Sequence, residues 1–230
     1  MLHFEDPILL AKGVKRGFPI PGGETFFALK GVDIAAPRGK LTILKGKSGS
    51  GKTTLMNILG ALDLPTEGTV QFDGKELTTL GEKERTALRR REIGFVFQSV
   101  ALIPIMSAFE NVDYALRLGG YKGDRRARAM ECLDMVGLAG RSSHMPAEMS
   151  GGEQQRVAIA RAIAHQPKLI FADEPTGELD TNTAISVVKI FKDLCATQGV
   201  SFVMTTHDTG FMEIGDAVYE LEGGEVISEH

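Results

Sequence analysis

Short apolar runs separated by turn residues fill the first part of the chain. Pro21-Gly22-Gly23 is one such turn, and Asp73-Gly74 follows the last of these runs. Short apolar runs that alternate with turns are typical of antiparallel sheets and hairpins, so we predict both here. The charged stretch 82–91 predicts a helix after the hairpin. The predicted strands are residues 8–10, 26–29, 32–35 and 70–72.

The middle of the chain has a helical pattern. Between residues 107 and 165, Gly and Pro breaks separate three stretches of this kind. We predict that they pack together as a helical lobe. The predicted helices are residues 110–118, 125–136 and 152–165.

Three runs that are apolar at nearly every position predict strands of a different kind. Such continuous runs are typical of strands buried on both faces of a parallel sheet. They are residues 41–44, 169–172 and 202–205. Stretches with helical spacing follow two of them, at 53–62 and 183–197, and residues 218–221 and 226–227 flank Gly223-Gly224 as a terminal hairpin. The fold class is therefore α/β.

We predict one domain over residues 1–230, because this length buries a large core. An antiparallel β subdomain and an α/β core would occupy about 1–98 and 166–230, and a helical subdomain about 99–165. No internal repeat and no low-complexity tract interrupts the chain.

Composition excludes several classes of protein. Hydrophobic residues make up 43% and charged residues 24% of the chain, as in ordinary globular proteins. The net charge of −4 lacks the basic surplus of non-specific nucleic-acid binding, so we expect no nucleic-acid partner. Cys132 and Cys195 have no metal-ligand spacing and predict reduced thiols without chemistry.

No segment predicts a signal peptide or a membrane span. The N-terminal MLHFEDPILL lacks a basic region followed by a long apolar stretch, and the longest apolar run, 100–106, is too short to cross a bilayer. If a membrane is involved, we expect a partner to supply the spanning helices.

The segment GKSGSGKT fits the phosphate-binding pattern G-x-x-x-x-G-K-[ST] and lies between a predicted buried strand and a predicted helix. Backbone N–H groups and the helix N-terminus would bind phosphate oxygens, Lys52 would reach the β and γ phosphates, and the Thr53 hydroxyl would ligate Mg²⁺. The loop by itself does not separate kinases, GTPases and transport ATPases. The predicted ATP-binding residues here are Gly46, Lys47, Ser48, Gly49, Ser50, Gly51, Lys52, Thr53 and Thr54.

Asp173 and Glu174 follow the predicted buried strand 169–172. Open α/β sheets bind ligands at the carboxyl ends of their strands. Asp173 would hold Mg²⁺, and Glu174, pointing the other way along the pleat, would take a proton from the attacking water. An isolated pair of acids at this place would more often cap the next turn, but the phosphate loop reverses that preference.

A second glycine motif precedes the predicted helix at 152–165. The residues MSGGE place Ser150, Gly151, Gly152 and Glu153 at a second helix N-terminus suited to a phosphate. One triphosphate does not need two such cradles in one chain. We therefore predict that this segment closes on the γ-phosphate of an ATP held by another copy, whereas an ordinary helix cap is the plainer alternative.

At these residues the chain resembles the ABC ATPases, whose signature is usually written LSGGQ and reads MSGGE here. The resemblance runs from about residue 8 to 227. Met149 in place of Leu and Glu153 in place of Gln keep the hydroxyl and amides of the motif, so we expect an active ATPase with a P-loop, RecA-like core. The resemblance assigns residues 46–53 to Walker A, Asp173 and Glu174 to Walker B, and Gly177-Glu178-Leu179-Asp180 to the D-loop.

The same resemblance assigns roles to three residues that would be weak signals alone. Gln98 would face Mg²⁺ as the Q-loop glutamine, and His207 would contact the γ-phosphate as the switch histidine. Phe18 would stack on adenine, although Phe26 or Phe27 could serve. Lys52, Gln98, Glu174 and His207 are the predicted catalytic residues, and the implied cofactors are ATP and Mg²⁺.

Further similarity points to the branch of the macrolide-export, lipoprotein-release and bacitracin-resistance ATPases, carried by residues 54–63, 65–68 and 172–177. This branch implies a homodimer at the cytoplasmic face of the membrane, with an integral permease of the FtsX or MacB type docked near Ser99 to Asn111. Core packing is the alternative for the apolar run 100–106. Three other classes of protein are disfavoured. A DNA-maintenance ATPase would need a coiled-coil insertion or a second cassette. A kinase or GTPase would lack the Ser-Gly-Gly signature, and a non-catalytic subunit would not be expected to keep all of the catalytic motifs.

Overall fold

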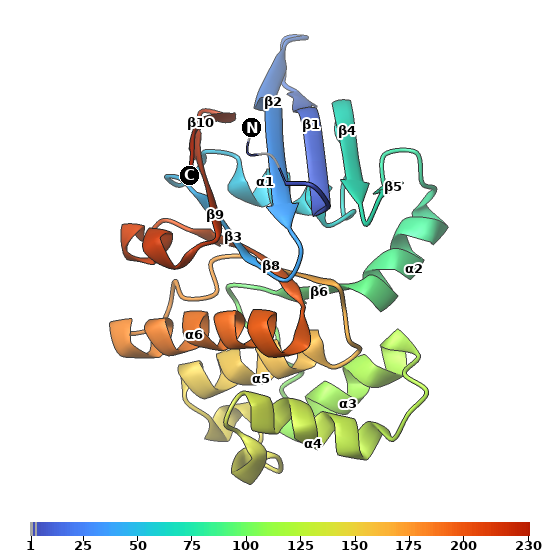
Figure 1. Cartoon of the computed structure of the whole chain (residues 1–230), viewed down its shortest axis with the longest axis vertical. Helices are drawn as coiled ribbons and strands as arrows, with labels where there is room; N and C mark the ends of the chain where they lie inside the picture. The colour runs from blue at the N-terminus through green and yellow to red at the C-terminus, as the bar shows by residue number, and fades with distance from the viewer. Residues whose placement is uncertain (1, 3) are drawn as a thin grey trace.

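A six-stranded sheet runs through the middle of the computed structural model, which describes Leu2 and residues 4–230 (Figure 1). Five of its strands are parallel, and the last strand returns antiparallel to its neighbour. The three runs predicted as buried strands form adjacent strands in this sheet, and almost all of their residues are buried. In spatial order the strands are β10 (Glu225–Glu229), β9 (Ala217–Glu222), β3 (Leu41–Lys45), β8 (Ser201–Thr206), β7 (Leu169–Ala172) and β6 (Ile93–Val96).

An antiparallel sheet covers one face of the six-stranded sheet, with helix α1 (Lys52–Leu59) packed between them. Its strands, in order, are β2 (Thr25–Pro37), β1 (Pro7–Pro19), β4 (Glu67–Phe72) and β5 (Lys75–Glu76). The two runs predicted at 26–29 and 32–35 belong to one strand of 13 residues. Gly31 interrupts them as a bulge, because Val32 pairs with Val14 while Lys30 pairs with the next residue, Lys15.

The other face of the six-stranded sheet packs against the helices (Figure 1). The predicted helices are confirmed to within a few residues at each end, and side chains cap four of them: Ser107, Asp124, Ser150 and Asp180 accept hydrogen bonds from backbone N–H groups of the first turn. The helices on this face are α3 (Ala108–Gly119), α4 (Arg125–Met135), α5 (Gly151–Ile163) and α6 (Thr181–Gln198), with short turns at η1 (Ala139–Arg141), η2 (Pro146–Glu148) and η3 (Thr209–Ile214). Helix α2 (Glu82–Glu92) instead packs its buried Leu88 into the cluster beneath the antiparallel sheet.

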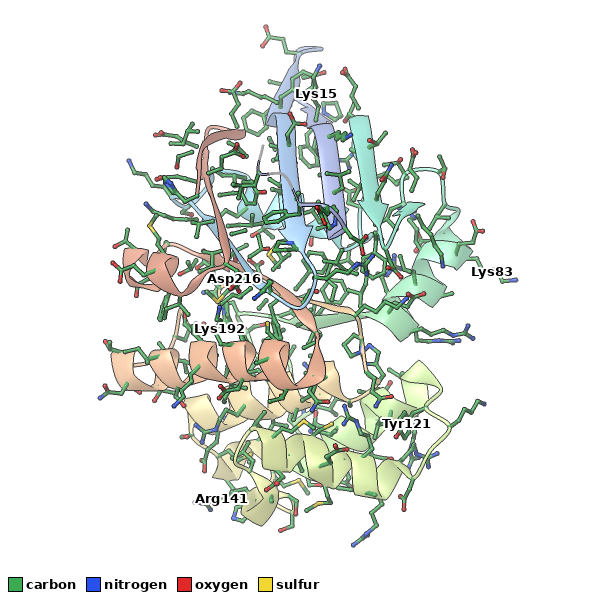
Figure 2. The ribbon with its side chains drawn as sticks, viewed as in Figure 1. Lys15, Lys83, Tyr121, Arg141, Lys192 and Asp216 are labelled. Carbon is green, nitrogen blue, oxygen red and sulfur yellow. The ribbon has the colours of Figure 1, made fainter. Side chains whose placement is uncertain are left out.

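Polar contacts join the helical layer to the sheet. Lys192 of α6 lies beside Asp216, which directly precedes β9 (Figure 2). The Lys192 ammonium is 2.8 Å from Asp216 Oδ2, and the same oxygen accepts a hydrogen bond from the backbone N–H of Leu41 at 2.9 Å. These contacts tie the helix to two neighbouring strands of the central sheet.

The strand β6 was not predicted from the sequence. It contains only four residues, and Gly94 weakens its apolar pattern. A Cβ on Gly94 would lie 2.6 Å from the carbonyl oxygen of Ala162, so the glycine allows α5 to pack directly on the strand.

Two further findings concern helix length and the cysteines. None of the helices within the described residues is long and apolar enough to span a membrane. Cys132 and Cys195 are both buried and free, and burial raises their thiol pKa values to about 11 and about 12. Such thiols stay protonated at neutral pH and are poor nucleophiles.

Candidate functional site

The glycine-rich segment forms the loop between β3 and α1, where the sequence predicted it. Gly51, with a φ of 104°, is the last residue before the helix, and no side chain caps that helix. A Cβ at Gly51 would lie 2.8 Å from the carbonyl oxygen of Ala28. Glycine is therefore required for the left-handed backbone and for the close approach of β2, and the first N–H groups of α1 remain available for an anion.

Lys52 lies under this loop and is only 5% exposed. Its ammonium donates hydrogen bonds to the carbonyl oxygens of Gly46 at 2.7 Å and Lys47 at 3.2 Å. The same nitrogen lies 3.6 Å from Glu174 Oε1. The lysine is thus held in place by the loop itself, with its charge directed at Glu174.

Asp173 and Glu174 follow the last residue of β7 and face the loop together. Asp173 Oδ2 accepts a hydrogen bond from the Thr53 hydroxyl at 3.3 Å, across 120 positions of sequence. The pleat argument, which turned the two acids to opposite sides, is wrong. The strand ends at Ala172, and Glu174 has a left-handed φ of 43°, which brings its carboxylate back toward Lys52.

His207 and Gln98 follow β8 and β6, the two neighbours of β7 in the sheet. The Nδ1 atom of His207 is 3.3 Å from Glu174 Oε2. A Cβ on Gly177 would lie 3.5 Å from the Gln98 amide nitrogen and 3.7 Å from Glu174 Oε2, which places Gln98 on the same side as Glu174. The carboxyl ends of adjacent parallel strands therefore gather these motifs at one sheet edge.

A pocket of about 400 Å³ is lined by residues of the phosphate loop and of the antiparallel sheet. Phe18 and Phe26 are paired residues on β1 and β2, and both line the pocket. The Arg16 guanidinium carbon lies 4.8 Å from the centroid of the Phe18 ring. Phe27 pairs with Gly17 and does not line the pocket. Phe26 was a sequence alternative to Phe18, and the pairing of the strands brings the two rings to the same pocket. The remaining lining residues are Ala28, Ser48, Gly49, Gly51, Lys52, Thr53, Thr54 and Glu174.

The second glycine motif lies at a separate hollow of about 510 Å³, whose lining shares no residue with the loop pocket. Ser150 caps α5 in a capping box: Ser150 Oγ accepts from the N–H of Glu153 at 3.3 Å, and Glu153 Oε2 accepts from the N–H of Ser150 at 2.9 Å. That backbone hydrogen bond holds the pKa of Glu153 below its usual range. Arg141, at 3.4 Å, is a further partner of the Glu153 carboxylate.

The residues after Glu174 form the opposite wall of this hollow. Asp180 caps α6, and its pKa is held low by hydrogen bonds from the hydroxyl and the N–H of Thr183. A Cβ on Gly152 would lie 2.5 Å from the methyl carbon of Thr183, so glycine is needed for α5 and α6 to begin side by side. The motif and the predicted D-loop thus form one surface.

The predicted docking segment, 99–111, has one exposed and one buried side. Leu102 packs on the core, whereas Ile105 is 84% exposed. Arg161 of α5 donates hydrogen bonds to the carbonyl oxygens of Val100 at 3.0 Å and Ala101 at 2.5 Å, and these two residues have left-handed φ values of 57° and 50°. Asn111 bonds both the N–H and the carbonyl of Ile103.

The oxygen donors near the loop suit a hard cation. The Thr53 hydroxyl and the Asp173 carboxylate lie together, and Mg²⁺ prefers oxygen ligands of this kind in combination with substrate phosphates. The donor set therefore fits an ion that is shared with a phosphate ligand.

Comparison with known proteins gives a consistent result. The family model described as ABC transporter matches residues 29–177. The ATP-binding protein YknY of Bacillus subtilis is 44% identical over 93% of both chains, and the lipoprotein-releasing ATP-binding protein LolD of Pseudomonas syringae is 44% identical over 90% of this chain and 91% of its own. The macrolide export protein MacB of Agrobacterium fabrum is 43% identical over 97% of this chain, which spans only 34% of that protein.

Solved structures agree with the sequence comparison. Two dimeric structures of the ABC cassette MJ0796, a protein of Methanocaldococcus jannaschii, superpose with a TM-score of 0.87 and cover 96% of this chain and 97% of theirs. Their sequences are 41% and 42% identical to this one, and the first is a post-hydrolysis state bound to ADP and Pi.

Proposed function

This chain belongs to the ABC transporter family and is an ATP-binding subunit with ATPase activity, and we propose that it works as a head-to-tail dimer enclosing ATP and Mg²⁺. The family and the fold class predicted from the sequence are confirmed. The residue roles, the dimer geometry, the division into subdomains and the membrane partner given below are proposals.

One observation carries the catalytic part of the proposal. Lys52 and Thr53 lie within 3.6 Å of Glu174 and Asp173, respectively, although more than a hundred positions separate the two pairs. Lys52 and the N-terminus of α1 bind the phosphates. Thr53 and Asp173 hold Mg²⁺, which supplies charge neutralisation on the phosphate oxygens when it is bound.

The remaining groups act on the attacking water. Glu174 accepts its proton, and His207, 3.3 Å from the Glu174 carboxylate, orients that carboxylate and contacts the γ-phosphate. Gln98, on the same side of the site as Glu174, contacts the metal ion or the attacking water. The Phe18 ring stacks on adenine, with Phe26 at the other side of the pocket.

The separation of the two hollows supports the proposed dimer. The motif at Ser150, Gly151, Gly152 and Glu153 opens on a surface that contains no residue of the phosphate loop. Within one chain, the motif and the phosphate loop therefore open on different hollows. A second copy, turned head to tail, would place its loop-bound ATP there, as a two-fold axis brings each surface of one protomer to the complementary surface of the other.

We propose that an integral permease docks on the segment 99–111 at the cytoplasmic face of the membrane. Ile105 supports this site as an apolar side chain that is 84% exposed in the isolated chain. The segment begins directly after Gln98, and Arg161 donates hydrogen bonds to two of its carbonyl oxygens. Arg161 lies on α5, the helix that begins at the second glycine motif, so the segment contacts elements that carry both motifs. An FtsX or MacB type of permease is the finer form of this proposal.

Cell fractionation tests the docking site. A tagged chain expressed in its own host should sediment with washed membranes, and Ile105→Asp should move most of it to the supernatant without lowering the melting temperature. Ile227→Asp is the matched control, because Ile227 on β10 is also exposed, at 54%, and lies on another element. Equal sedimentation of both variants and the unchanged chain would place the docking surface elsewhere.

A phosphate-release assay tests the ATPase assignment itself. The purified chain should release phosphate from ATP when Mg²⁺ is present and should stop when the ion is chelated. Failure of the purified, folded chain to hydrolyse ATP at any protein concentration would contradict the assignment.

A further inference from the structure

Thr205 is the penultimate residue of β8 and lies level with the first acidic residue after β7. The two strands pair in parallel with Ala172 opposite Met204, which brings the next residues, Asp173 and Thr205, side by side. The Thr205 side chain is fully buried, at 0% exposed. Its surroundings are therefore fixed by the sheet, and solvent does not satisfy its hydroxyl.

The hydroxyl of Thr205 bonds both acidic residues of the site. It donates to Asp173 Oδ1 at 2.7 Å and accepts from the backbone N–H of Glu174 at 2.8 Å. A hydroxyl has one proton to donate, so this proton is committed to Asp173. One buried side chain is thus in direct contact with the proposed metal ligand and with the backbone of the proposed base.

The contact to Asp173 selects which carboxylate oxygen remains available. Oδ1 is occupied by Thr205, and Oδ2 faces the Thr53 hydroxyl at 3.3 Å. Because the carboxylate is pinned on one oxygen, it cannot rotate freely about its terminal bond. Oδ2 is then presented to the metal ion that Thr53 and a nucleotide would share.

The contact between Thr205 and Glu174 stabilises the left-handed backbone conformation of Glu174. A left-handed conformation is disfavoured for residues with a Cβ, and Glu174 has a φ of 43°. The hydrogen bond from its N–H to Thr205 opposes relaxation to an extended conformation. An extended Glu174 would follow the pleat and point away from Lys52, so the bond keeps the carboxylate on the side of the phosphate loop.

We propose that Thr205 is a positioning residue of the ATPase site, which orients Asp173 for the metal ion and fixes the backbone from which Glu174 acts. This inference rests on the proposed function of those two acids. It assigns to Thr205 no contact with ATP or with the attacking water.

Four residues at position 205 separate the hydroxyl from side-chain volume. Thr and Ser carry the hydroxyl, whereas Val and Ala lack it; Thr and Val are large, whereas Ser and Ala are small. If Thr205 positions the acids, Thr205→Ser should behave like the unchanged chain, and Thr205→Val should behave like Thr205→Ala. If its role is packing alone, Thr205→Val should resemble the unchanged chain, and Thr205→Ser should resemble Thr205→Ala.

Two measurements on the purified chain give the readout. In calorimetric titration, Mg²⁺ should strengthen ATP binding to the Thr and Ser forms. In the Val and Ala forms this strengthening should be smaller by about 10- to 100-fold, the usual cost of removing a partner that orients a metal ligand. ATP binding without Mg²⁺ should be equal in all four. The turnover number should fall in the same two forms, with a higher Mg²⁺ concentration needed for half-maximal activity.

The outcomes are distinct. Grouping by size, or a Thr205→Val chain with unchanged Mg²⁺ dependence and turnover, would overturn the proposal. If one variant has a lower melting temperature, the other variant with the same hydroxyl status still provides the readout. Thr205→Val and Thr205→Ala both lack the hydroxyl, whereas Thr205→Ser and the unchanged chain both carry it. Absence of Mg²⁺-stimulated hydrolysis in the unchanged chain would instead overturn the proposed function.

Discussion

Two helices of this molecule begin with glycines and a polar residue, yet their N-termini are in different environments. At α1, no side chain caps the helix, Lys52 is buried beneath the loop, and the two acids that follow β7 face the loop. At α5, Ser150 and Glu153 cap their own helix at an open surface. In the proposed function the first N-terminus is a finished anion site within one chain. In the same proposal the second N-terminus is an unfinished site, which a second chain completes.

The largest expected effect is at the finished site. Lys52→Ala should weaken ATP binding by about 100-fold or more, because a charge-assisted contact to two phosphates is lost. Calorimetric titration measures this directly. Lys83→Ala is the control, since Lys83 is an exposed lysine of α2 far along the chain from the loop (Figure 2). Unchanged affinity in Lys52→Ala would remove the lysine from the site.

Glu174→Gln should separate binding from hydrolysis. Loss of a general base typically lowers turnover by about 10² to 10⁴, whereas an amide of the same size keeps the geometry of the binding site. ATP affinity should stay within a few-fold, and with ATP and Mg²⁺ the chain should shift from monomer to dimer in light scattering. Wild-type turnover would assign the base to another residue.

Ser150→Ala should affect only the unfinished site. Binding of ATP to dilute monomer should not change, because the motif lies outside the loop pocket, but ATP-dependent dimerisation in the Glu174→Gln background should be lost. Ser107→Ala is a close control: Ser107 forms the same capping box at α3 with Glu110. Both variants should lose about 1 kcal/mol of folding stability, the usual cost of a cap. Loss of dimerisation in both would attribute the effect to stability.

The smallest effect concerns an ion-pair cluster outside both sites. Hydrogen bonds from Lys168 and then Arg38 hold the pKa of Asp73 below its ordinary value of 3.8. A carboxyl whose folded pKa is depressed stabilises the fold above pH 3.8 and loses that contribution as the pH falls through the folded pKa. Asp73→Asn should cost at most about 1 kcal/mol at pH 7, because the cluster is partly exposed.

Chemical denaturation at several pH values checks this expectation. The difference between the unchanged chain and Asp73→Asn should shrink as the pH is lowered below the usual range of an Asp side chain, and ATP binding at pH 7 should be equal. A difference that persists at low pH would show that packing, and not charge, is responsible.

The sequence predicted the parts of this molecule that depend on local pattern. The loop at residues 46–53, the buried run before Asp173 and the helix N-terminus at Ser150 are each contained in a short segment. Their chemistry follows from residue type and from the ends of strands and helices. For the same reason, the helices of the lobe were placed to within a few residues.

Features set by distant residues were not predicted. The left-handed backbone of Glu174 is held by Thr205, 31 positions later, so the pleat argument placed its side chain on the wrong side. The single strand β2 depends on a bulge at Gly31 opposite Val14 and Lys15. The conformation of Val100 and Ala101 depends on Arg161, about 60 positions away. Only pairing in three dimensions reveals these contacts.

Thiol crosslinking between two copies tests the central claim most directly. One copy carries Ser48→Cys and the other, with a size tag, carries Ser150→Cys, both in the Glu174→Gln background. The native cysteines are buried with raised pKa values and should not compete. A short crosslinker should join the two copies when ATP and Mg²⁺ are present, and not with ADP or without nucleotide. If ATP never promotes this product while it still binds to each copy, the two sites do not meet across a dimer, and the account of α5 as an unfinished half-site is wrong.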